Sequence, residues 1–87
     1  MIAVKALQDC ILLRPDFDLV NSNLDAIKNI ILDLAGRGSY QIVLDLPRDT
    51  VIDSMGIGVI VACVKTLKQY DSNLTVKTDN PDIIDFF

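Results

Sequence analysis

Apolar and polar positions along the first part of the chain predict two short strands joined by a tight turn. Segments 2–7 and 10–13 are short apolar runs, and the polar break at residues 8–9 is typical of a hairpin. We expect the second strand to end at Arg14-Pro15, because proline cannot donate a hydrogen bond to a strand ladder. The chain therefore begins with a predicted antiparallel pair.

An amphipathic helix is predicted next. It follows the run 22–25, Ser-Asn-Leu-Asp, which resembles a capping box with Ser22 at the start and aspartate in place of glutamate. Apolar residues then recur at helical spacing, at Leu24, Ile27, Ile31 and Leu34. The run 35–38, Ala-Gly-Arg-Gly, is expected to end the helix, because glycine tolerates the backbone conformation that follows one. We expect the apolar stripe to face the core, since a small domain can spare little apolar surface.

The rest of the chain alternates strands with helices. Segment 40–46 contains a continuous apolar run, as expected of a strand that is covered on both faces or lies centrally in a sheet. A helical pattern begins near Ser54 and continues to residues 68–70, and a short strand is predicted at 74–77. Pro81 near a helix start predicts a last short helix over 82–87.

The helix that begins near Ser54 carries more apolar residues than one face needs. One stripe consists of Ile57, Ile60, Val64 and Leu67. Met55, Val59 and Val61 fall off that stripe. They either face solvent, which is one signature of a protein contact, or lie under a neighbouring loop. The sequence leaves both possibilities open.

The order of elements predicts an α/β fold with a small mixed four-stranded sheet, two main helices and a short C-terminal helix. Two successive strand–helix–strand units should have right-handed crossovers and parallel strands. Loops after parallel strands emerge at one edge of the sheet, where ligand sites are commonly found. Segments 16–18, 53–54 and 79–80 should meet there, as an acidic rim around a serine at a helix N-terminus. Such acidic loops are also ordinary helix-capping chemistry.

The stretch 51–61 departs most clearly from local preferences. Gly56 and Gly58 fall in the first turns of the second helix, where each costs about 1 kcal/mol relative to alanine. We expect Ser54 to be the N-cap, its hydroxyl accepting a hydrogen bond from an amide two or three residues on. The glycines either provide bare backbone for a contact or only ease a tight strand-to-helix turn.

The run 53–58, Asp-Ser-Met-Gly-Ile-Gly, preceded by Ile-Val-Leu-Asp-Leu at 42–46, resembles the signature of STAS domains, and in particular of bacterial anti-sigma factor antagonists. The resemblance covers about residues 4–87, with Phe17-Asp18 as a weaker match. It implies that Ser54 is a regulatory phosphorylation site and that residues 1–87 form a single STAS-like domain, C-terminally short relative to the family. The partner-binding residues that it implies are Asp18, Asp53, Ser54, Met55, Gly56, Ile57 and Gly58.

The resemblance also implies partners. In this family the unmodified antagonist binds an anti-sigma factor with serine kinase activity, and this binding frees the sigma factor. The kinase then phosphorylates the serine, and a metal-dependent serine phosphatase reverses the modification. We therefore expect a non-enzymatic switch in transcription regulation, cytoplasmic, without cofactor, and monomeric or weakly dimeric. STAS-like domains also serve as structural or accessory subunits beside transporters or in signalling complexes, an alternative that needs no phosphorylation.

Composition disfavours several other functions. A formal net charge of −4 argues against binding nucleic-acid phosphates, which needs a basic patch. The absence of histidine excludes Ser-His-Asp hydrolysis and zinc sites that use histidine ligands.

The spacing of other residues disfavours further kinds of site. Cys10 and Cys63 lack metal-ligand spacing and are expected to be buried thiols. Val61 replaces the third glycine of a dinucleotide fingerprint, and 16–18 lacks the rest of a calcium loop. The longest apolar run, 59–64, is too short to insert across a membrane.

Overall fold

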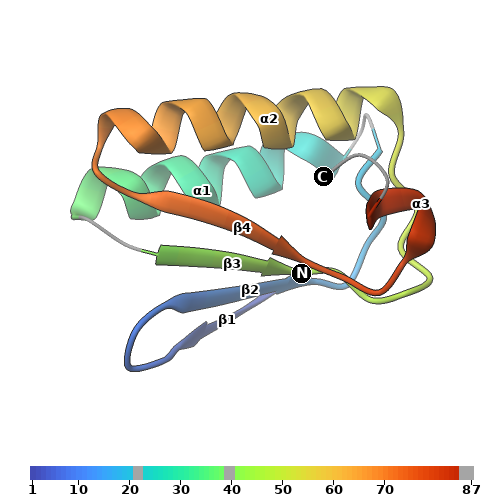
Figure 1. The fold of residues 1–87 in the computed structure, drawn as a ribbon, viewed down its shortest axis with the longest axis horizontal. Helices are drawn as coiled ribbons and strands as arrows, with labels where there is room; N and C mark the ends of the chain where they lie inside the picture. The colour runs from blue at the N-terminus through green and yellow to red at the C-terminus, as the bar shows by residue number, and fades with distance from the viewer. Residues whose placement is uncertain (21–22, 39–40, 85–87) are drawn as a thin grey trace.

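Two helices lie side by side on one face of a four-stranded sheet (Figure 1). The computed structural model describes residues 1–20, 23–38 and 41–84. The strands are β1 (Ile2–Ala6), β2 (Ile11–Pro15), β3 (Gln41–Asp45) and β4 (Asn73–Lys77), and the main helices are α1 (Leu24–Arg37) and α2 (Ser54–Gln69). The predicted fold class, a mixed four-stranded sheet with two main helices, is confirmed.

The sheet combines one antiparallel pair with two parallel pairs, in the order β1-β2-β3-β4. β1 and β2 form the predicted hairpin, with Val4 opposite Leu13. β2, β3 and β4 are parallel, with Ile11 beside Ile42 and Ile42 beside Leu74. Both crossovers advance in the same direction across the sheet, and right-handed crossovers of that kind place both helices on the same face.

The core lies between the sheet and the two helices. Ile42 and Leu44 of β3 are fully buried, whereas Val43 between them is partly exposed. The continuous apolar run of β3 therefore reflects an interior position in the sheet and not cover on both faces. Helical residues that complete the core are Leu24, Ile27, Ile31, Ala35, Ile60, Cys63 and Leu67.

The second strand includes Arg14 and Pro15, two residues beyond the predicted segment 10–13. β2 continues through Pro15, which pairs with Ile2 of β1. The Asp16 amide donates to the Met1 carbonyl at 3.1 Å, so the adjacent Pro15 nitrogen faces the opposite side of the strand. On that side the ladder to β3 has already ended at Leu13. The proline is tolerated because no partner strand needs its missing N–H.

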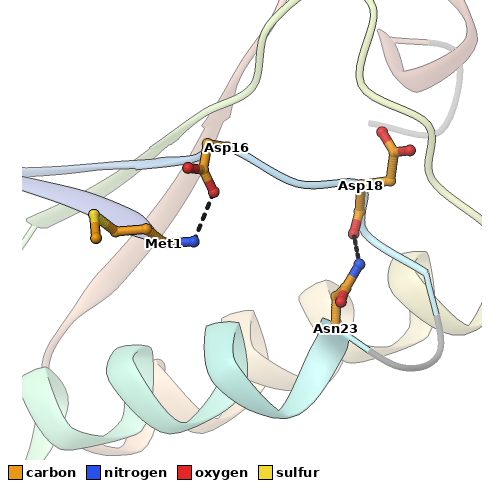
Figure 2. Close-up of polar contacts among 4 residues, drawn as sticks. All are labelled: Met1, Asp16, Asp18 and Asn23. Carbon is orange, nitrogen blue, oxygen red and sulfur yellow. Dashed lines mark hydrogen bonds and ion pairs between the residues drawn. The ribbon is translucent and has the colours of Figure 1, made fainter.

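The start of α1 also differs from the prediction. The N-cap position is Asn23, whose side chain makes no capping hydrogen bond, and Ser22 lies outside the described residues. Asn23 Nδ2 instead donates to the Asp18 carbonyl at 3.0 Å, which ties the helix to the loop after β2 (Figure 2). Ala35 takes the fourth buried position of the stripe, while Leu34 is partly exposed.

The C-terminal part of the described chain forms one helical turn, α3 (Pro81–Ile84), which begins at the predicted proline. Ile83 of this turn is fully buried and closes one end of the core. Residues 85–87 of the expected helix lie outside the described residues. Within the described ranges, no helix combines the length and apolar character needed to cross a bilayer.

Candidate functional site

The loops after β2 and β3 are joined by a short stretch of backbone pairing at the carboxyl edge of the sheet. Leu19 and Ile52 form an isolated parallel bridge. The Leu19 amide donates to the Val51 carbonyl at 2.8 Å, and the Asp53 amide donates to the Leu19 carbonyl at 3.3 Å. The start of α2 is therefore held against the loop after β2, as the topology predicted.

Asp18 stabilises this junction from its side chain. Its Oδ1 accepts a hydrogen bond from the Val51 amide at 2.9 Å, while its carbonyl accepts from Asn23. Asp16 lies apart from it and pairs with the N-terminal ammonium of Met1 at 2.6 Å (Figure 2). Of the two acidic residues expected on this loop, only Asp18 bonds to the loop before α2.

The loop after β4 reaches the same edge through Asn80. The Asn80 side chain is buried and its Nδ2 donates to the Thr50 carbonyl at 2.9 Å. Asp79 beside it is exposed. The three predicted loops thus meet, held together by Asp18 and Asn80. Asp16, Asp18 and Asp79 are all exposed at this edge.

Asp53, and not Ser54, caps α2. Asp53 has an extended backbone (φ −100°, ψ 179°), and its Oδ1 accepts a hydrogen bond from the Gly56 amide at 2.7 Å. Ser54 is the first residue of the helix and its side chain is exposed. The predicted N-cap was wrong by one residue, because aspartate and serine cap equally well and stand side by side here. The Ser54 hydroxyl is therefore not needed to start the helix.

The two glycines of the motif lie in different surroundings. A Cβ at Gly56 would lie 2.3 Å from the Leu19 carbonyl oxygen and 2.8 Å from Ile52 Cγ1, so only glycine allows α2 to pack this closely. A Cβ at Gly58 would have no neighbour within 4 Å. Sequence reasoning singled out Gly56 but missed Leu19, because a contact made by a backbone carbonyl leaves no side-chain signature.

The outer side of α2 presents apolar side chains to solvent. Met55 is 54% exposed and Val61 is 40% exposed, whereas Ile57 and Val59 are partly buried. Of the two possibilities left open by the sequence, solvent exposure holds for Met55 and Val61, while Val59 packs partly against the core. Ser54 thus stands at the edge of an exposed apolar surface.

Within the described ranges, no group of three or more Cys, Asp, Glu or His side chains is arranged to hold a metal ion. Both cysteines are free thiols: Cys63 is buried as predicted, but the prediction was wrong for Cys10, which is partly exposed. What the edge offers is an exposed serine hydroxyl, the N-terminus of a helix and adjoining apolar surface.

Comparison with known proteins connects these features to one family. A search of curated protein sequences finds no significant match. One solved structure that matches is titled "Crystal Structure Analysis of Mglu", with a TM-score of 0.61 and 20% sequence identity. The match covers 92% of this chain but only 19% of that one. At this identity the match supports the fold alone. The family model for the STAS domain matches residues 1–87. STAS domains are generally non-enzymatic and commonly mediate protein–protein interactions. Together with the four-stranded sheet and its two helices, this match shows that the chain belongs to the STAS domain family.

Proposed function

We propose that this protein is an anti-sigma factor antagonist-like switch, which binds an anti-sigma factor with serine kinase activity while Ser54 is unmodified. Phosphorylation of Ser54 by that kinase releases the complex, and a serine phosphatase restores the binding form. The proposal depends above all on the position of Ser54, which is exposed at the first residue of α2 while Asp53 supplies the cap. No catalytic step is assigned to the chain itself.

The fold is expected to survive this modification. A phosphoserine carries a charge of about −1.5 to −2 at neutral pH. At the N-terminus of a helix, unpaired amides and the helix dipole favour such a charge. Because the capping hydrogen bond runs from the Gly56 amide to Asp53, a phosphate on Ser54 removes no bond that holds the helix.

The same phosphate is expected to disrupt a partner interface. It would stand beside the Asp53 carboxylate and the exposed side chain of Met55. An unpaired charge enclosed between two proteins costs several kcal/mol, and about 3 kcal/mol already lowers affinity more than a hundredfold. Modification can therefore release the partner while leaving the folded chain unchanged.

The test begins with the partner retained by the Ser54→Ala form in cells of the native organism. Once that protein is purified, we expect it to phosphorylate the wild-type chain at Ser54 and to bind Ser54→Asp at least a hundredfold more weakly than Ser54→Ala. Asn73→Asp is the matched control, because it adds one negative charge on an exposed residue of β4, at the opposite edge of the sheet.

Equal binding of Ser54→Asp and Ser54→Ala, with no phosphate on Ser54 by mass spectrometry, would contradict the proposal. A stable complex that ignores both substitutions would instead favour the alternative, a structural or accessory STAS subunit of a transporter or signalling complex.

A further inference from the structure

An apolar groove runs between α1 and α2 on the side that faces away from the sheet. Its volume is about 240 Å³. Its walls are formed by Lys28 and Leu32 of α1 and by Met55, Gly58, Val59 and Ala62 of α2. We call this surface the interhelical groove. Lys28 is the one charged residue among its described lining residues.

We propose that the interhelical groove docks an amphipathic helix of the partner protein, whose apolar side chains fill the groove and whose carboxylate pairs with Lys28. This inference rests on the proposed function in one respect, since the partner is taken to be the protein whose binding Ser54 controls. It adds a binding surface, and the chemistry of what that surface accepts.

The size and shape of the groove favour a protein segment over a small molecule. Sites for small molecules usually enclose about 300–1,000 Å³, and this groove is smaller and partly open to solvent. Two neighbouring helices leave a furrow into which the ridge of a third helix can pack. Recognition of an amphipathic helix in an apolar groove is a recurring mode of binding, with one or a few buried side chains supplying most of the affinity.

The charge of the groove specifies the polar part of the partner. Lys28 is exposed and makes no ion pair within the part of the chain that the structure describes. Cys63 lies at the floor of the groove, and burial raises the pKa of its thiol. The ammonium of Lys28 is close enough to oppose this shift, because its positive charge lowers the same pKa. An unpaired cation beside an apolar floor is complementary to an aspartate or glutamate next to apolar side chains.

Two further observations link the groove to the switch. Gly58 lies in the helix interior, where glycine is destabilising relative to alanine, yet a Cβ there would touch nothing in this chain. The bare backbone leaves room in the groove that the fold itself does not use. Met55, at one end of the groove, directly follows Ser54, so a single partner helix can contact both.

The first test measures affinity for the purified partner that Ser54→Ala retains. Gly58→Leu, which fills the groove, and Lys28→Glu, which reverses its charge, should each weaken binding at least tenfold. Gln69→Leu and Lys68→Glu are matched controls on exposed residues of α2 outside the groove. Each control should bind the partner with an affinity within about threefold of that of the protein without the substitution. Thermal unfolding of each variant verifies that it is folded.

The outcomes separate this inference from the proposed function. If Ser54→Asp loses binding while Gly58→Leu and Lys28→Glu bind as well as the unsubstituted protein, the docking proposal is overturned and the phosphorylation switch is still supported. If both groove variants lose binding and Ser54→Asp has no effect, the docking proposal is supported and the phosphorylation switch is overturned.

A second measurement identifies the occupant directly. A photo-crosslinking amino acid at position 62 should capture a helical segment of the partner that carries Asp or Glu, whereas the same group at position 69 should not. Crosslinking of position 62 to a second copy of this chain, or to no protein while position 55 crosslinks the partner, would overturn the proposal.

Discussion

The inner and outer sides of α2 at its N-terminus show how one short motif serves two purposes. On the inner side, Gly56 lies against the Leu19 carbonyl and cannot accept a side chain. On the outer side, Gly58 faces open space, next to exposed Met55. The same residue type, two positions apart, is required by the fold in one case and unused by it in the other. The motif therefore divides into residues that build the edge of the sheet, Asp53 and Gly56, and residues available to a partner.

The largest effect is expected for Gly56→Ala. The new Cβ would overlap a backbone oxygen and the Ile52 side chain, and a backbone oxygen cannot rotate away as a flexible side chain can. We expect the free energy of unfolding to fall by about 2–3 kcal/mol or more, as in overpacked cores. Urea denaturation followed by circular dichroism measures this loss. An unfolding free energy equal to that of the wild type would show that α2 can move away from Leu19.

Loss of the helix cap should come next. Asp53→Ala removes the carboxylate that accepts from the Gly56 amide and should lower the unfolding free energy by about 1 kcal/mol. Asp53→Asn keeps an acceptor oxygen and should retain most of that stability. Ser54→Ala should be nearly neutral by the same denaturation measurement. If Ser54→Ala lowered the free energy of unfolding more than Asp53→Ala, Ser54 would be the residue that caps the helix.

Gly58→Ala should have the opposite sign. Its Cβ meets nothing in this chain, and alanine is the better helix former, so stability should rise by up to about 1 kcal/mol. Thermal and urea denaturation beside Gly56→Ala would make the contrast between the two glycines direct. A destabilised Gly58→Ala protein would mean that the outer side of α2 is less open than its geometry indicates.

The order of the elements could be predicted from the sequence, whereas the helix cap and the role of Gly56 could not. Hydrophobic periodicity and the rule of right-handed crossovers predicted the order of elements and the edge where three loops meet, since both depend on residue types spaced along the chain. The position of the cap could not be predicted, because Asp53 and Ser54 are adjacent cap formers and only the backbone conformation chooses between them. Nor could the role of Gly56, which depends on a carbonyl from a distant loop.

The predicted strand segment 10–13 stopped two residues short of the observed end at Pro15 for a related reason. Proline excludes a hydrogen bond on one side of a strand, and whether that side has a neighbour depends on where the adjacent strand begins and ends. Here β3 pairs with β2 only as far as Leu13, so the exclusion has no consequence. Local rules predict what a residue cannot do, but the sheet decides whether that matters.

The smallest effect concerns Cys63, on the inner side of α2 and at the floor of the interhelical groove. Burial raises the pKa of its thiol in the folded chain above the ordinary value, with the nearby Lys28 charge opposing the shift. As pH rises through the ordinary thiol range of about 8.5–9, the unfolded chain releases a proton that the folded chain still holds. The free energy of unfolding should therefore decline with increasing pH in that range.

Unfolding free energies measured across this pH range should decline less steeply in Cys63→Ala than in the wild type. Cys10→Ala leaves the buried thiol in place and should keep the steeper decline of the wild type. Equal slopes in the wild type and Cys63→Ala would mean that the groove floor is more hydrated than its 3% exposed cysteine implies.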